Sequence, residues 1–163
     1  MEKDKAILSL EYKINTLEQN KKSSYVEISG DQKEEEENVN NVTHDIASAL
    51  HIDPNLFDIE NAYRKPSNRN LDKPLIIVEF ASRRKRDEFL KKRGKIEYKS
   101  NRIYINKSLT AFNRKLFWES RMKGKELGYC FIWTSHGRIF CNTYNWAIQS
   151  NTYFKHYKKY YPD

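Results

Sequence analysis

The run Leu75-Ile76-Ile77-Val78-Glu79-Phe80 is the most hydrophobic stretch of the sequence and the one around which its fold can be worked out. A run this apolar predicts a strand buried at the centre of a sheet. Further strands are expected at residues 24–28, 59–64 and 102–105, and helices at 39–50 and 82–93. The elements therefore follow the order βαββαβ, which predicts an α+β protein with a ferredoxin-like domain.

Further elements are expected on both sides of this domain. In residues 3–20, Ile7, Leu10, Ile14 and Leu17 follow the 3-4-3 spacing of a coiled coil. Two interpretations remain open, because so short a repeat is marginal in water: a helix packed on its own domain, or an oligomerising coiled coil. After residue 106, the pattern predicts a helix at about 111–123 and a hairpin of residues 129–133 and 138–141. We expect a coiled-coil-like helix (1–22), an RRM-like ferredoxin-like domain (23–106), a helix-hairpin domain (107–141) and an aromatic, basic tail (142–163).

Charge is distributed unevenly along the chain. Residues 1–62 carry 6 basic and 14 acidic side chains, whereas residues 63–163 carry 24 basic and 8 acidic ones. So basic a segment repels itself unless a polyanion neutralises it, which favours nucleic acid as a partner and an anionic membrane as the second candidate. No stretch approaches the roughly 20 apolar residues that cross a bilayer, and the N-terminus lacks the apolar core of a signal peptide. We expect an intracellular protein, in the nucleus or cytoplasm, with no membrane partner.

Sequence motifs of the common enzyme classes are absent. The sequence has no phosphate-binding glycine loop, no HExxH and no GxSxG. Cys130 and Cys141 are its only cysteines, and they lack the neighbouring Cys/His spacing of a zinc site. Reduced thiols are favoured, although a single bridge across the hairpin stays open. We predict a protein without enzymatic activity, catalytic residues, cofactor or metal.

Basic residues interleaved with aromatic ones indicate contacts with nucleic acid. Lysine and arginine side chains neutralise phosphates, and exposed aromatic rings stack on bases without regard to sequence. Because the central strand lacks the aromatic signature of common RNA-recognition domains, contacts are expected away from the sheet face. Trp118 and Phe131 are interpreted mainly as core residues. The candidate nucleic-acid-binding residues are Tyr63, Arg64, Lys65, Arg69, Arg83, Arg84, Arg86, Arg93, Lys95, Tyr104, Arg114, Lys115, Arg121, Lys123 and Trp133.

Several blocks of the sequence resemble a known family. They are residues 59–65 (IENAYRK), 73–80 (KPLIIVEF) and 103–110 (IYINKSLT), with a basic helix between the last two. Together they resemble the few-polyhedra (FP) protein family of baculoviruses and its insect relatives. The same architecture occurs in the first-open-reading-frame proteins of LINE-type retrotransposons. The resemblance implies an oligomerising coiled coil and two domains that together bind single-stranded nucleic acid. By position, the basic and aromatic candidates that it implies are Tyr63, Arg64, Lys65, Arg86, Arg93, Tyr104, Arg114 and Arg121.

Two functions follow as hypotheses. The first is a sequence-tolerant protein that binds single-stranded RNA or DNA, with the role of a nucleic-acid chaperone of retrotransposon or virus-like origin. The second is a coiled-coil protein-interaction factor of the viral few-polyhedra type, in which nucleic-acid binding is secondary. In the second, the helix of residues 3–20 pairs with a partner; its apolar positions are also the candidate contacts of a homo-oligomer.

Overall fold

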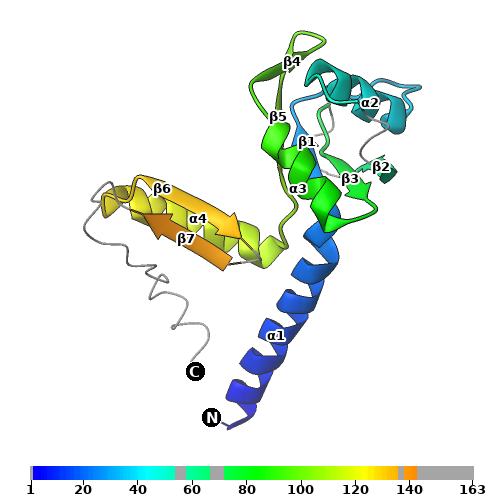
Figure 1. The fold of residues 1–163 in the computed structure, drawn as a ribbon. Coiled ribbons are helices and arrows are strands. Elements are labelled where there is room, and N and C mark those ends of the chain that lie inside the picture. The colour runs from blue at the N-terminus through cyan, green and yellow to red at the C-terminus, as the bar shows by residue number, and fades with distance from the viewer. Residues whose placement is uncertain (1, 54–57, 67–71, 136–137, 143–163) are drawn as a thin grey trace. The chain divides into compact units, whose positions relative to one another are not determined.

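The computed structural model describes residues 2–53, 58–66, 72–135 and 138–142. They fall into two compact units (Figure 1). One unit is Ser23–Ser108, and the other joins Met1–Lys22 to the chain from Leu109 onward. The helix at the N-terminus therefore belongs to the same unit as the C-terminal segment, although the sheet unit separates them in sequence.

The first unit is built on a five-stranded antiparallel sheet. Its strands are β1 (Tyr25–Ser29), β2 (Ile59–Arg64), β3 (Ile76–Phe80), β4 (Ile96–Tyr98) and β5 (Asn101–Lys107). They lie in the order β2-β3-β1-β5-β4, so the hydrophobic run that forms β3 has a partner on each side. Val78 of β3 lies opposite Val26 on one side and Ala62 on the other. The predicted ferredoxin-like arrangement is confirmed.

Strand β4 is an addition that the sequence did not predict. It forms a hairpin with β5 in which Tyr98 lies opposite Asn101. The two residues between them, Lys99 and Ser100, both have positive φ, at 47° and 60°. Positive φ at both central residues is the geometry of a type I′ turn, which usually carries Asn or Gly. Because Lys and Ser occupy these positions, no hairpin can be recognised there from residue types alone.

Two helices cover one face of this sheet. Helix α2 (Val39–Ala49) starts at the capping residue Asn38, and α3 (Arg83–Lys92) starts at Ser82, whose hydroxyl accepts a hydrogen bond from the Lys85 N–H. Side chains of both helices share one apolar core with alternate residues of the strands. Phe80 of β3 and Phe89 of α3 lie at its centre, with ring centroids 5.2 Å apart. The other face of the sheet carries the residues that alternate with this core.

The second unit contains α1 (Glu2–Lys21), α4 (Ala111–Glu126), β6 (Phe131–Ser135) and β7 (Arg138–Asn142), and a short 3₁₀ turn, η1 (Lys22–Ser24), follows α1. The predicted helix and hairpin are confirmed, while residues 136 and 137 of the predicted turn and nearly all of the predicted tail lie outside the described residues. Trp133 of β6 lies opposite Phe140 of β7. Gly124 of α4 faces the Ile132 side chain so closely that a Cβ there would overlap it. Helix and hairpin are therefore packed at short range.

Helix α1 is attached to the start of α4 by polar side chains. The Thr110 hydroxyl donates to Asn15 Oδ1 at 2.6 Å, and Gln19 Oε1 accepts from the Thr110 N–H at 3.1 Å and from Asn113 Nδ2 at 2.9 Å. Asn15 and Gln19 lie one turn apart, and the apolar stripe of α1 is on a different side of the helix. That stripe stays 54–69% exposed, at Ile7, Leu10, Ile14 and Leu17. The apolar stripe therefore does not attach α1 to its own unit.

Candidate nucleic-acid interface

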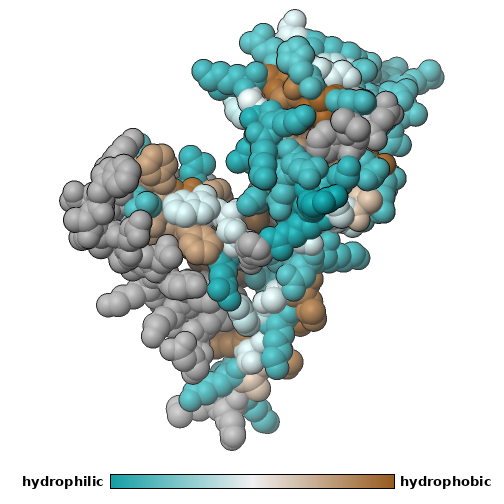
Figure 2. All heavy atoms as spheres, viewed as in Figure 1, coloured by the Kyte–Doolittle hydropathy of each residue, from teal (hydrophilic) through white to brown (hydrophobic). Residues whose placement is uncertain are grey.

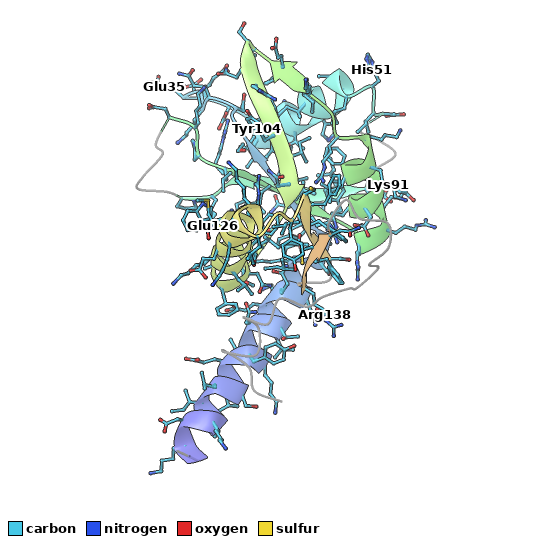
Figure 3. The ribbon with its side chains drawn as sticks, turned by 90° about the vertical axis from the view of Figure 1, so that its left-hand side faces the viewer. Glu35, His51, Lys91, Tyr104, Glu126 and Arg138 are labelled. Atoms are coloured by element: carbon cyan, nitrogen blue, oxygen red, sulfur yellow. The ribbon has the colours of Figure 1, made fainter. Side chains whose placement is uncertain are left out.

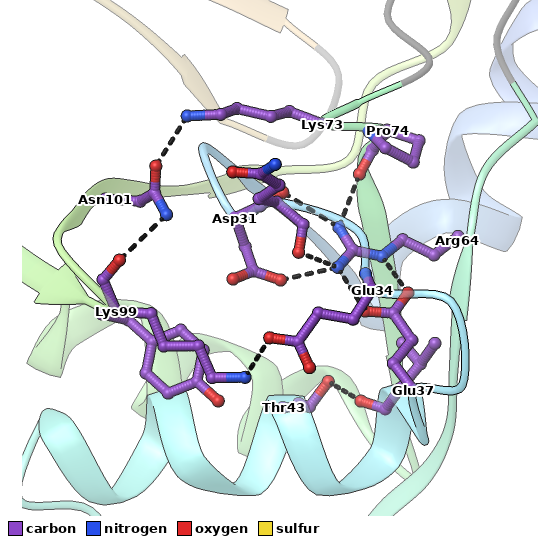
Figure 4. Close-up of polar contacts among 12 residues, drawn as sticks. Asp31, Glu34, Glu37, Thr43, Arg64, Lys73, Pro74, Lys99 and Asn101 are labelled. Carbon is purple, nitrogen blue, oxygen red and sulfur yellow. Dashed lines mark hydrogen bonds and ion pairs between the residues drawn. The ribbon is translucent and has the colours of Figure 1, made fainter.

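Arg64, at the end of β2, has an internal role (Figure 4). Its guanidinium makes a 2.6 Å ion pair with Asp31 and holds both carboxylate oxygens of Glu37, at 2.7 and 2.8 Å. It also donates to the Pro74 carbonyl at 3.0 Å. Burial lowers the pKa of Arg64, but these hydrogen bonds outweigh that effect and raise it, while Arg64 lowers the pKa of Glu37. The prediction of a phosphate contact at Arg64 does not fit this placement, because two carboxylates occupy the guanidinium.

The sheet face opposite the helices gathers two of the predicted aromatic residues. Tyr63 of β2 is 41% exposed and Tyr104 of β5 is 49% exposed. Each alternates with core residues of its strand, so both point away from α2 and α3. Figure 3 shows Tyr104 along β5 and Lys91 on α3. The central strand of this face is aliphatic, whereas β2 and β5 carry exposed tyrosines; where nucleic acid contacts the protein stays a prediction.

Basic side chains share this face with the two tyrosines. Arg102 precedes Tyr104 by two residues, and its guanidinium carbon lies 5.2 Å from the centroid of the Tyr104 ring. Lys65 follows Tyr63 by two residues, and its N–H donates to the Leu75 carbonyl at 2.8 Å, which continues the β pairing. Tyr63 and Lys65 lie on the β2 side and Arg102 and Tyr104 on β5, with β3 and β1 between the two pairs; we refer to the four residues together as the open-face cluster. Arg102 was missed in the sequence, although its two-residue spacing from Tyr104 was the available signal.

Tyr25 lies on the same face but is already engaged. Its hydroxyl donates to Glu79, directly opposite on β3, at 2.7 Å. This hydrogen bond, together with burial and the Glu79 charge, raises the pKa of Tyr25 to about 12. Tyr25 therefore contributes to the sheet itself, and the open-face cluster is the part of this face that offers exposed rings.

Most, but not all, of the predicted basic residues on and after α3 are exposed. Arg83 and Arg84 lie on its surface, each near a carboxylate one turn later at 3.7 and 3.8 Å. Exposed pairs of this kind contribute little to stability and leave the charges accessible to solvent. Arg93 and Lys95, just beyond the helix, are also exposed. These four residues keep their place as candidate phosphate contacts.

Arg86 differs from the other cations of α3. It is 5% exposed, and its Nε has no hydrogen-bond partner, although Asp87 Oδ1 lies 3.3 Å away. Burial lowers the pKa of Arg86. Burial also lowers the pKa of Lys107, and the nearby positive charge of Arg86 lowers it further. A direct surface contact of Arg86 with phosphate, as predicted, does not fit this burial.

In the second unit, α4 carries four predicted cations, and all of them are exposed. Arg114, Lys115 and Arg121 point to one side of the helix, whereas Lys123 projects on another. Trp133 is partly exposed and stacks on Phe140, with ring centroids 5.7 Å apart and an interplanar angle of 17°. The remaining predicted contact, Arg69, belongs to the sheet unit in sequence and lies outside the described residues.

The interpretation of Trp118 and Phe131 as core residues is wrong. Trp118 is 63% exposed on α4 and Phe131 is 52% exposed on β6. Packing against α1 and a two-stranded hairpin buries only a narrow strip of α4, namely Asn113, Ser120 and Gly124. Large apolar residues outside that strip are therefore left in solvent.

The cysteines and the acidic and histidine side chains bear on other kinds of site. Cys130 is exposed and Cys141 is buried, both as free thiols, and burial raises the pKa of Cys141. Within the described ranges, no three His, Cys, Asp or Glu side chains are grouped so as to hold a metal ion. None of the described helices combines the length and apolar character needed to cross a membrane.

Residues 110–143 match the family model described as Baculovirus FP protein domain 2, a segment that contains α4, β6 and β7. This match supports the resemblance to the baculovirus FP family. No curated protein matches the chain. The relationship to retrotransposon proteins stays a prediction.

Proposed function

We propose that this protein binds single-stranded nucleic acid with little regard to sequence. The observation that carries the proposal is the open-face cluster, where two exposed tyrosines and two cations share one face of an RRM-like sheet. An exposed ring on a sheet offers a base a flat apolar surface, and such stacking stabilises by about 1–3 kcal/mol per base. Cations beside the rings meet the phosphates on either side of a stacked base.

The charge distribution supports the same proposal. The exposed residues Arg83, Arg84, Arg93 and Lys95, on and just beyond α3, add basic side chains to those of the open-face cluster. Figure 2 shows hydrophilic side chains over much of the visible surface of this unit. The resemblance to retrotransposon proteins adds the proposal that binding serves a nucleic-acid chaperone, on RNA or DNA. Such binding releases counterions and therefore weakens steeply with salt.

Fluorescence anisotropy with a labelled strand of about 20 nucleotides tests this function, between about 50 and 200 mM salt. We expect binding that weakens steeply over this range, and a Tyr63→Ala/Tyr104→Ala variant that binds about tenfold or more weakly at fixed salt. The Tyr63→Phe/Tyr104→Phe variant is the matched control, because it keeps both rings and should bind like the wild type. Absent binding, or binding that is insensitive to salt, would contradict the proposal.

A second candidate function rests on α1. We propose that its exposed apolar stripe pairs with a second copy of the chain, as in an interaction factor of few-polyhedra type. The polar attachment through Asn15 and Gln19 leaves the stripe available, and its spacing is that of a coiled coil. In this function, self-association is primary and nucleic-acid binding secondary.

Replacing two residues of the stripe, as Leu10→Lys/Ile14→Lys, should convert an oligomer into a monomer. Charges placed in the seam of a coiled coil lose their hydration when the helices pair, and they repel one another. Sedimentation equilibrium of wild type and variant over a range of concentrations measures the change. Ser9→Lys, at an exposed position off the stripe, should leave the oligomer intact. A wild type that is monomeric at every concentration would exclude this pairing.

A further inference from the structure

We propose that the seam between α3 and β5 is a site for a small free oxyanion, of the class of inorganic phosphate or sulfate, centred on the guanidinium of Arg86. The site goes beyond the proposed function, because its ligand is a free anion. Arg86 is 5% exposed, and its Nε is the one side-chain nitrogen or oxygen in the described ranges that is buried without a hydrogen-bond partner. A buried charge without partners is costly, so its surroundings should indicate what completes it.

The register of the sheet places Lys107 under the first turns of α3. Val26 of β1 lies opposite Val78 of β3 and opposite Lys107 of β5. Because β3 and β5 both run antiparallel to β1, their C-terminal ends lie at the same end of the sheet, and α3 starts shortly after β3 ends. Lys107 alternates with the core residues Ile103 and Ile105, so its side chain points to the face that α3 covers.

Two arginines approach Lys107 from α3. Arg86 and Arg93 are seven residues apart, which is close to two turns, so they lie on the same side of the helix. Arg93 Nη1 lies 3.5 Å from the Ile105 carbonyl oxygen, which it donates to, and this contact fixes its guanidinium against β5. Burial lowers the pKa of Lys107, and the positive charges of Arg86 and Arg93 lower it further. The three cations therefore lie within electrostatic range of one another.

Asp87 compensates this group only in part. Its Oδ1 lies 3.3 Å from Arg86 Nε without forming a hydrogen bond, and its Oδ2 lies 3.7 Å from Arg83 Nε. The Asp87 side chain is 42% exposed, so water screens its charge. A single carboxylate divided between two arginines leaves the guanidinium of Arg86 without a charge-assisted hydrogen bond. An oxyanion supplies both the missing acceptors and a negative charge for Lys107.

The burial of Arg86 favours a free oxyanion over a nucleic-acid strand. Each phosphate within a strand carries a sugar on two of its oxygens, and such phosphates are neutralised by cations that project from the surface. A free tetrahedral oxyanion carries no substituent, and the planar guanidinium of arginine can hold it with two parallel N–H bonds. An anion bound there joins α3 to β5. Because it binds the folded chain, it should also stabilise the fold.

Isothermal titration calorimetry of the full chain with inorganic phosphate, at constant ionic strength, tests the site. We expect one site per chain, and a midpoint of thermal unfolding that rises by about 3 °C or more at about twenty times the dissociation constant. Arg86→Met should lose both effects. Without phosphate, this variant should unfold at the wild-type temperature or above it, because it removes a buried charge that lacks partners. Lys91→Met, at an exposed position of α3 (Figure 3), is the matched control and should bind phosphate like the wild type.

The outcomes separate this site from general effects of phosphate and from the proposed function. No phosphate binding by the wild type, or an equal thermal rise in wild type and Arg86→Met, would overturn the site, because exclusion of phosphate from the protein surface stabilises both. Lys107→Met should also weaken phosphate binding, which keeps the test valid if Arg86→Met does not fold. Binding of adenosine 5′-monophosphate as tightly as inorganic phosphate would overturn a free-anion site. A wild type that binds phosphate but no nucleic-acid strand would support this site and overturn the proposed function.

Discussion

Replacing Arg64 with methionine is expected to lower the free energy of unfolding by about 3–5 kcal/mol. The substitution keeps the apolar stem but leaves the nearly buried carboxylates of Asp31 and Glu37 without their cation. It also removes the donors to the Pro74 and Asp31 carbonyls, which fasten the loop after β1 to the strands. Urea denaturation followed by circular dichroism measures the loss. Arg84→Met, which breaks an exposed pair, should change stability by less than about 0.5 kcal/mol.

The same ion pair makes stability depend on pH with a definite sign. Arg64 lowers the pKa of Glu37, so the folded protein binds this proton less readily than the unfolded chain. The stabilisation is therefore complete above the ordinary pKa of a glutamate and is lost as the pH falls through the lowered value. The Arg64→Met variant should lose this part of the acid dependence. A variant that is as stable as the wild type, with the same acid profile, would show that Arg64 does not hold the loop.

The sequence predicted elements well where a local pattern determines them. The apolar run of β3 and the capped helices α2 and α3 can be recognised within windows of about ten residues, because periodicity and capping are local properties. The role of Arg64 cannot be found in this way, since Asp31 and Glu37 lie 33 and 27 residues away in the chain. A basic residue beside other basic residues gives no local sign that it will be buried.

The candidate site was predicted less completely than the fold. Sequence patterns indicate Tyr63 and Tyr104 one at a time, and the register that aligns β2, β3, β1 and β5 establishes that they share a face. Alternation within each strand did contain part of this information, because Ala62, Ile103 and Ile105 belong to the core. Trp118 was misinterpreted for another reason. Burial of a tryptophan depends on how much surface its unit can cover, which no local pattern reports.

Gly30 is the second position at which a single substitution should have a large effect. It follows β1 with φ of +104°, and a Cβ there would overlap the carbonyl oxygen of Arg102 on β5. The overlapping atom belongs to the backbone, so no flexible side chain can move aside. We expect Gly30→Ala to destabilise by about 2–4 kcal/mol through the strained φ and the forced separation of the strands. Thermal and urea denaturation measure this loss.

Gly94→Ala is the matched control for this substitution. Gly94 lies just after α3, where a Cβ would meet no atom within 4 Å. Alanine there reduces the freedom of the unfolded chain, so stability should be unchanged or rise by up to about 1 kcal/mol.

Gly30 also lies between β1 and Asp31, while its close neighbour Arg102 belongs to the open-face cluster. A Gly30→Ala variant should therefore lose affinity for a single strand even at temperatures where it stays folded, and unchanged affinity would show that the backbone at Arg102 does not position the cluster.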